Sequence, residues 1–169
     1  SQAVHWFQTA ADQGFSQAQY KLGAMYNNGA GVDQSNSQAL AWLQKSADQG
    51  HPIAQYDVGV IHYHGRSVPQ DYHEAMRWYR LSAEQGCADA QNNLGMIFHS
   101  GLGVERDDAT ALHWYSLAAE QEFAGAQYNM GYMYLHGFGV EKNSVEATKW
   151  FRRAADQGLE QAVALFEGQ

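Results

Sequence analysis

The chain has 169 residues, with ten Lys and Arg against 18 Asp and Glu and a formal net charge of −8. This acidic balance disfavours a nucleic-acid partner, because binding a phosphate backbone needs a basic stripe. No apolar run approaches the ~20 residues that a membrane-spanning helix requires, so the sequence predicts no direct membrane insertion.

The tryptophans repeat at a fixed spacing. All five stand 36 residues apart, at Trp6, Trp42, Trp78, Trp114 and Trp150. Alanine, glycine and valine positions keep the same period, for example Ala18, Gly29 and Val32 with their counterparts in each later repeat. A fixed period of this length indicates a stack of similar supersecondary units, so the chain is predicted to be a repeat array.

In chain order, residues 2–13 are predicted to form the second helix of an incomplete repeat, 1–14. Four full repeats follow at 15–50, 51–86, 87–122 and 123–158, and an incomplete repeat at 159–169 is predicted to hold a first helix that still runs at residues 165–169. Both ends are expected to be cuts through a longer array, since an end repeat leaves an apolar face without a neighbour.

Each full repeat is predicted to hold two amphipathic helices. In the first repeat Ala18 and Leu22 start one apolar stripe at helical spacing, and Ala39, Trp42 and Leu43 start the other. The second helices have predicted N-caps at Ser35, Asp71, Asp107 and Asn143, with capping-box partners at Gln38, Glu74 and Glu146. They are predicted to end at Gly50, Gly86 and Gly158, where the left-handed conformation costs glycine little. Glu122 takes this slot in the third repeat, where the B helix either ends in the same left-handed conformation or ends in another way.

A glycine also recurs inside every first helix, at Gly23, Gly59, Gly95 and Gly131. Glycine in a helix costs roughly 1 kcal/mol relative to alanine, so its recurrence needs a reason. We expect a close approach by the tryptophan or the backbone of the partner helix.

The pattern AxxxLGxxYxxGxGV, followed by a capped start and AxxWxxxAAxQG, resembles the Sel1-like repeat, a relative of the tetratricopeptide repeat. The resemblance covers the whole chain and implies an all-α fold, a right-handed α/α superhelix of antiparallel helix pairs. It also implies that the AxxxLGxxY helices, here called A helices, line a concave wall and that the AxxWxxxAA helices, called B helices, form the outside. Two loop residues depart from the pattern, Glu122 and Ser67.

No catalytic, cofactor or metal site is predicted. The eight histidines include no pair at i, i+4 spacing, and His62 and His64 point to different faces of a helix. The GxG motifs lack the preceding strand and following lysine of a phosphate loop, and they are interpreted as turns. The acidic pair Asp107 and Asp108 stands at a helix start, where it favours the helix dipole.

Cys87 is the only cysteine, which excludes an internal disulfide, and it is interpreted as a half-buried small apolar residue. Some Sel1-like proteins with a cysteine pair in each repeat have been credited with β-lactam binding. Because that cysteine signature is missing here, the resemblance gives little support to a small-molecule, glycan-binding or hydrolytic function, which stays the alternative hypothesis.

Residues that recur in every repeat build the scaffold, whereas those that differ are free to serve a partner. On the A helices the differing positions form one stripe at i, i+4, i+7 and i+8, which by the resemblance faces the concave groove. Tyr, Asn, His and Met suit recognition, since they combine contact area with adaptable hydrogen bonds and little charge. The predicted partner-binding residues, here called the A-helix stripe, are Tyr20, Asn27, Asn28, Tyr56, Tyr63, His64, Asn92, Met96, His99, Ser100, Tyr128, Tyr132 and His136.

The sequence therefore predicts a non-enzymatic interaction module that binds a protein or peptide in the groove and needs no cofactor. The resemblance suggests a bacterial origin and favours a periplasmic or secreted location. A third hypothesis is self-association through the ends of the array.

Overall fold

The computed structural model describes residues 2–166, and all the regular structure in that range is helical. The helices form two compact units, Ser1–Gln85 and Gly86–Gln169. The N-terminal unit holds α1 (Gln2–Asp12), α2 (Ser16–Asn28), α3 (Asn36–Asp48), α4 (Pro52–His64) and α5 (Tyr72–Glu84). The C-terminal unit holds α6 (Ala88–Ser100), α7 (Asp108–Glu120), α8 (Ala124–His136), α9 (Ser144–Asp156) and α10 (Glu160–Val163).

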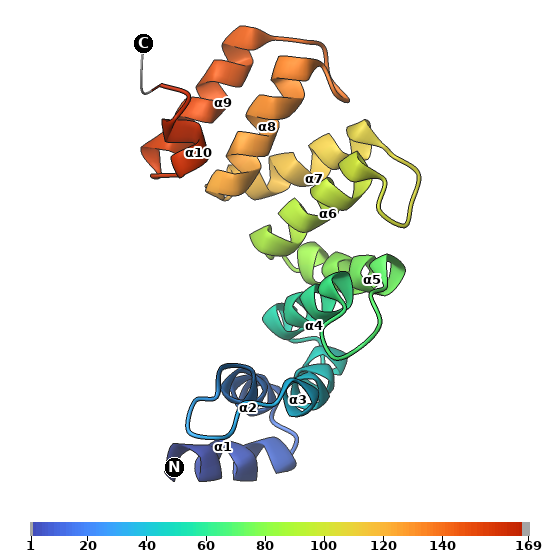
Figure 1. Ribbon diagram of the computed structural model, residues 1–169, viewed down its shortest axis with the longest axis vertical. Helices are drawn as coiled ribbons and strands as arrows, with labels where there is room; N and C mark the ends of the chain where they lie inside the picture. Colours follow the sequence, from blue (N-terminus) through green and yellow to red (C-terminus); the bar gives the residue numbers. More distant parts are fainter. Residues whose placement is uncertain (1, 167–169) are drawn as a thin grey trace. The chain divides into compact units, whose positions relative to one another are not determined.

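Within each unit, successive helices pack against one another in pairs (Figure 1). The A helix α2 packs on the B helix α3, and α4 packs on α5 in the same way; α6 with α7 and α8 with α9 form the equivalent pairs of the C-terminal unit. The two helices of a pair are antiparallel, because Gln19 near the start of α2 contacts Gln49 at the end of α3. The predicted all-α fold of helix pairs with a 36-residue repeat is confirmed.

The ends differ slightly from the prediction. Helix α1 covers the predicted first segment almost completely. Helix α10, by contrast, ends at Val163 and is followed by turns at 164–166. The helix expected at 165–169 is therefore wrong for residues 165 and 166, and residues 167–169 lie outside the described residues.

The predicted N-caps are confirmed. The side chains of Ser35, Asp71, Asp107 and Asn143 each accept a hydrogen bond from a backbone N–H in the first turn of the next helix. The prediction of capping boxes is wrong, however. The backbone N–H of each N-cap residue, which a capping box would bind to the side chain three residues later, donates instead to a carbonyl in the last turn of the preceding A helix, for example Asp71 N to His62 O at 2.9 Å. Glu74 instead accepts hydrogen bonds from Arg77 and from the Trp78 indole.

Among residues 2–166, two non-glycine residues have left-handed backbone angles, Glu122 with φ of +60° and Ser67 with φ of +66°. Glu122 occupies the slot in which Gly50, Gly86 and Gly158 are also left-handed. The predicted B-helix ending is thus kept in the third repeat even though a side chain is present.

The glycine inside each A helix faces the residue that follows the tryptophan. A Cβ atom added to Gly59 would lie 2.6 Å from the ring of Tyr79, and Gly95 and Gly131 face Tyr115 and Phe151 at the same distance. The close approach is therefore confirmed, and so is the backbone as a partner, since Leu43 N would lie 3.1 Å from a Cβ at Gly23; the tryptophan, the other expected partner, is wrong. The reason is that successive residues of a helix differ in direction by about 100°.

The tryptophans are not equally buried. Trp78 is 3% exposed and packs with Leu43, Ala47, Ala54 and Val58, whereas Trp6 on α1 is 67% exposed. In the C-terminal unit the core is formed largely by alanines with Tyr115, Met130 and Met133. The repeat slot alone therefore does not determine how deeply its side chain is buried.

In each helix pair a buried glutamine joins the start of the A helix to the end of the B helix, a feature that was not predicted from the sequence. The Oε1 atoms of Gln19, Gln55, Gln91 and Gln127, all at most 5% exposed, accept a hydrogen bond from Gln49, Gln85, Gln121 and Gln157 at 2.6–2.7 Å. The Nε2 atoms of Gln19, Gln55 and Gln127 donate to the carbonyls of Ala11, Ala47 and Ala119 on the preceding B helix. One buried amide thus links three helices.

Candidate functional site

All residues of the A-helix stripe lie at the surface or partly below it, and none is fully buried. Tyr20, Asn27 and Asn28 are on α2, and Tyr56, Tyr63 and His64 are on α4. Asn92, Met96, His99 and Ser100 are on α6, whereas Tyr128, Tyr132 and His136 are on α8. Each unit brings some of these residues together in a pocket of its own.

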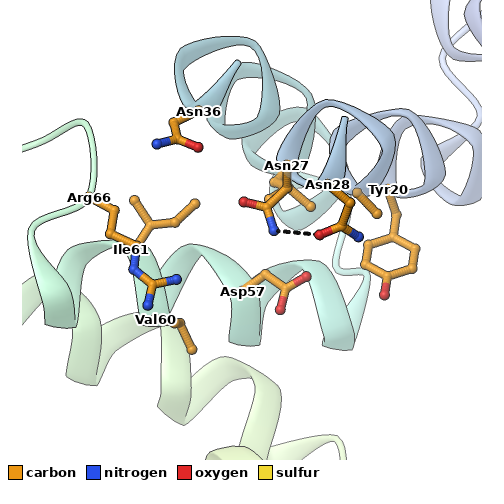
Figure 2. Close-up of a pocket in the computed structure, with 10 residues that line it drawn as sticks. Tyr20, Asn27, Asn28, Asn36, Asp57, Val60, Ile61 and Arg66 are labelled. Atoms are coloured by element: carbon orange, nitrogen blue, oxygen red, sulfur yellow. Dashed lines mark hydrogen bonds between the residues drawn. The ribbon is translucent and has the colours of Figure 1, made fainter. Parts of the chain in front are cut away.

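The pocket of the N-terminal unit has a volume of about 180 Å³ and lies between α2, α3 and α4 (Figure 2). It contains three residues of the stripe, Tyr20, Asn27 and Asn28, and is completed by Ala24, Asn36, Leu43, Asp57, Val60, Ile61 and Arg66. Figure 2 shows the hydrogen bond from Asn27 to Asn28, at 3.4 Å, on one side of the pocket and the Arg66 guanidinium on the other.

Amide, carboxylate and guanidinium groups give this first pocket a polar lining. Burial, with a smaller effect from the Asp57 carboxylate, raises the pKa of Tyr20, so its hydroxyl stays protonated. The Tyr20 ring stacks on His51 with centroids 4.7 Å apart. Its position is thereby held, and the pocket offers hydrogen-bond donors and acceptors at the same time.

The stripe residues of α4 lie among aromatic rings of α5. The Tyr56 ring is 5.8 Å from that of Tyr79, and the Tyr63 ring is 5.3 Å from that of Tyr72. Burial, followed by the neighbouring Tyr72, raises the pKa of Tyr63. Tyr56 and Tyr63 thus pack against their own repeat, and neither lines the first pocket.

The pocket of the C-terminal unit has a volume of about 300 Å³ and a more apolar lining. Four of its residues belong to the stripe, Met96, His99, Tyr128 and Tyr132, and the others are Tyr115, Asn129 and Met133. Tyr115 is 3% exposed, and its burial strongly raises the pKa of its hydroxyl. Thioethers and tyrosine rings favour contact with a flat or apolar group.

His99 connects this second pocket to a charged group. Its Nδ1 atom lies 2.7 Å from a carboxylate oxygen of Asp108, which also accepts hydrogen bonds from Arg106. Arg106 first, and then His99, lowers the pKa of Asp108. The His99 ring also lies near Tyr132 and Phe138, with centroid distances of 6.0 and 5.2 Å.

The remaining stripe residues lie beside this pocket without lining it. The His136 ring stacks on Phe138 and lies 4.4 Å from the Tyr132 ring. Asn92 accepts a hydrogen bond from Asn129 at 2.9 Å, and Ser100 is exposed at the end of α6.

Several residues at these pockets were missed, although the sequence contained a signal for two of them. Asp57 lies one position after the stripe, where the other repeats have Lys21, Asn93 and Asn129. Arg66 likewise shares its slot with Ala30, Leu102 and Phe138. Both slots differ from repeat to repeat, which is the criterion that selected the stripe itself.

Within residues 2–166 the structure has no helix that is long and apolar enough to cross a membrane. In the same range, no group of three or more His, Cys, Asp or Glu side chains is arranged to hold a metal ion.

The family model described as Sel1 repeat matches the chain five times, at residues 1–15, 16–51, 52–87, 88–123 and 124–159. These matches end one residue later than the predicted repeats. None of the curated proteins compared with the chain matches it.

Solved structures resemble the chain over most of its length. A protective antigen of uropathogenic Escherichia coli with an SLR fold has 37% identity and a TM-score of 0.91, over 94% of this chain and 34% of the antigen. A Sel1 repeat protein from Oxalobacter formigenes has 34% identity and a TM-score of 0.88, over 94% of this chain and 65% of that protein. The immunity protein Pa5087 from Pseudomonas aeruginosa has 26% identity and a TM-score of 0.60, over 94% of this chain and 59% of the immunity protein.

This chain spans about a third to two thirds of the length of these proteins. Sel1-repeat proteins are generally protein-interaction scaffolds, and the fold is typically non-enzymatic. The chain belongs to the Sel1 repeat family, because the family model matches it five times and it is more than 30% identical to two solved Sel1-type structures.

Proposed function

We propose that this chain is a non-enzymatic interaction module and that the A-helix stripe binds a protein or peptide partner. One observation carries the proposal: in each unit, side chains that differ between repeats meet in a pocket on the A helices. Scaffold positions, by contrast, hold alanine, glycine and tryptophan in repeat after repeat. Variation concentrated at a pocket is typical of a surface that recognises one partner.

The chemistry of the two pockets supports a polypeptide partner. The first combines amides with one carboxylate and one guanidinium, and the second combines tyrosines with methionines. A polypeptide supplies matching groups of both kinds, namely backbone amides and apolar side chains.

The alternative function, binding or hydrolysis of a small molecule, is not favoured, because Cys87 is the only cysteine and no cysteine pair can form within a repeat. A groove that runs along the whole array remains a prediction, as does self-association through the ends. Light scattering of the purified chain over a range of concentrations would test the self-association.

The test compares variants on the two kinds of helix. Partners captured from bacterial lysate by the immobilised chain are identified, and the dissociation constant of each is then measured by calorimetry. Asn28→Ala and Tyr132→Ala are suitable variants, since Asn28 is exposed and the Tyr132 side chain is 39% exposed. Tyr56 and Tyr128 are less suitable, because they are more buried than Tyr132 and their rings pack on the core residues Tyr79 and Phe151.

We expect each variant to weaken binding by about tenfold, as loss of an interface anchor does, with the melting temperature unchanged. The matched control is Leu81→Ala on the B helix α5, where the side chain is 37% exposed. A partner whose affinity falls with Leu81→Ala but not with the two A-helix variants would contradict the proposal.

A further inference from the structure

The second pocket, in the C-terminal unit, contains one polar ring whose hydrogen-bonding state follows from its neighbours. His99 lines the pocket, and its Nδ1 atom is 2.7 Å from Asp108. Side-chain exposures of 22% for His99 and 21% for Asp108 show that the pair is largely removed from water. A hydrogen bond of this length and burial determines the tautomer of the imidazole.

Asp108 accepts hydrogen bonds and does not donate one. Two Arg106 nitrogens donate to it, the closer at 2.7 Å, and this contact lowers the pKa of Asp108. An ionised carboxylate has only acceptor atoms, so the proton in the short contact belongs to Nδ1 of His99. In the uncharged ring Nε2 then carries a lone pair, and it is the polar atom that His99 has left for a ligand.

The other walls define the shape and charge of that ligand. Met96 and Met133 provide sulfur atoms, and Tyr115, Tyr128 and Tyr132 provide ring faces and edges, an environment that favours an aromatic ring. The Arg106 guanidinium already neutralises Asp108, which disfavours a cation. A volume of about 300 Å³ is at the lower end of the range for ligand sites and suits one large side chain.

A pair of amides beside the ring pocket suits a peptide backbone. Asn129 lines the pocket and donates one hydrogen bond to Asn92. Each amide group has more hydrogen-bonding positions than this bond uses, with both donors and acceptors among them. A peptide residue whose side chain enters the pocket has one N–H and one C=O to pair with them.

We propose that the pocket lined by Met96, His99 and Tyr132 takes a tyrosine side chain of the partner, with the phenol hydroxyl donating to Nε2 of His99. The inference rests on the proposed function and specifies what the C-terminal unit recognises. Tyrosine meets both requirements of the site, since it combines an aromatic body with a donor at its far end. Phenylalanine would leave the lone pair of Nε2 without a partner.

The experiment uses N-acetyl-tyrosinamide and N-acetyl-phenylalaninamide as probes, with the whole chain carrying ¹³C-labelled methionine methyl groups. Spectra are recorded at pH 8. Met96 and Met133 report on the pocket, while Met25 on α2 and Met76 on α5 are internal controls. We expect shifts at Met96 and Met133 and an affinity about 3- to 10-fold higher for the tyrosine probe, the effect of one net hydrogen bond.

His99→Phe should abolish this preference by weakening the tyrosine probe while leaving the phenylalanine probe little changed. Long-range ¹H–¹⁵N spectra of the unaltered protein test the tautomer directly, so the inference can be tested even if the variant does not fold. A proton on Nε2 of His99 would overturn it. Equal affinities would do the same, as would shifts only at Met25 or Met76, or tighter binding of N-acetyl-lysinamide or N-acetyl-tryptophanamide.

The probe experiment and the partner experiment can fail separately, so a failure of the inference can be told apart from a failure of the proposed function. If the probes behave as expected but Asn28→Ala and Tyr132→Ala leave partner affinity unchanged, the preference of the pocket for tyrosine stands, whereas the A-helix interface and the role of the pocket in binding the partner both fail. If the probes show no preference while those variants weaken the partner, the interface stands and the tyrosine inference fails.

Discussion

Arg153 donates a hydrogen bond to the carboxylate of Glu122 at 2.7 Å, and Glu122 holds a left-handed backbone conformation with φ of +60°. The second carboxylate oxygen accepts from Gln127 at 2.8 Å. Gln127 first, and Arg153 second, lowers the pKa of Glu122. An L-residue thus takes the left-handed slot that Gly50, Gly86 and Gly158 occupy in the other repeats, and its carboxylate is held by two side chains.

Glu122→Gly should therefore have a pH-dependent effect. A carboxyl group with a lowered pKa in the folded state contributes stability above its unfolded pKa of about 4.3, and the contribution is lost as the pH falls through the folded pKa. At pH 7 the variant loses these contacts while relieving the backbone, and at pH 3 only the relief remains. Urea denaturation should show that the free energy of unfolding of the variant rises relative to that of the natural chain as the pH falls.

The control for this effect is Glu122→Gln, which removes the charge but keeps the left-handed side chain. It should be less stable than the glycine variant at both pH values. A difference between Glu122→Gly and the natural chain that stays constant from pH 7 to pH 3 would mean that the ion pair contributes nothing.

Gly139 should be far less tolerant of substitution than Gly158. Both are left-handed, with φ of +66° and +81°. A Cβ atom at Gly139 would collide with the backbone oxygen of Asp108 and lie 2.9 Å from the nitrogen of Ala109, whereas a Cβ at Gly158 would have no atom within 4 Å. Left-handed alanine alone costs roughly 1 to 2 kcal/mol, which is the loss expected for Gly158→Ala.

Gly139→Ala should exceed that loss by at least about 1 to 3 kcal/mol, the usual cost of overpacking, because backbone atoms cannot move aside as a side-chain end can. Denaturation midpoints of the two variants check the comparison. Equal losses would show that the loop between α8 and α9 can shift away from α7.

Local features were the ones that the sequence predicted well. A Ser, Asp or Asn before an apolar stripe caps a helix through atoms a few residues away, so Asp71 and Asn143 could be identified without knowledge of the fold. The left-handed angle at Glu122 was predictable for the same reason, since the slot follows directly from the repeat.

Contacts between residues far apart in the sequence were missed or wrongly predicted. Gln55 bonds to residues 8 and 30 positions away, and nothing in its local sequence distinguishes it from a surface glutamine. Its recurrence every 36 residues was the available signal. The pocket residues Asp57 and Arg66 come from α4 and the loop after it, so their meeting depends on how α4 and the loop fold back towards α2.

Gln55 should matter more for stability than its polarity suggests. It is 4% exposed, donates to the Ala47 carbonyl at 3.2 Å and accepts from Gln85 at 2.7 Å. Gln55→Ala removes both bonds and opens a cavity, while the Ala47 carbonyl keeps its bond from the Gly50 N–H, so the cost should be roughly 2 to 4 kcal/mol. Urea denaturation measures the loss.

The matched control is Gln44→Ala, because Gln44 bonds only to Asp48 on the same helix in an exposed position. Its effect should stay within about 0.5 kcal/mol. Similar values for the two variants would indicate that the buried glutamine pairs exchange readily for water.

Trp78 and Trp6 occupy the same repeat slot and test whether burial or slot determines the contribution of a tryptophan. Trp78 is 3% exposed, donates from its indole to Glu74 at 2.8 Å and lies under the Arg77 guanidinium. Trp78→Ala should therefore cost roughly 3 to 5 kcal/mol in denaturation experiments. Trp6 is 67% exposed, and Trp6→Ala should cost less than about 1 kcal/mol, because its removal opens no cavity in the described packing. Acrylamide should quench the emission lost with Trp6 more strongly than the emission lost with Trp78. A large loss of stability for Trp6→Ala would mean that α1 is anchored by this ring despite its exposure.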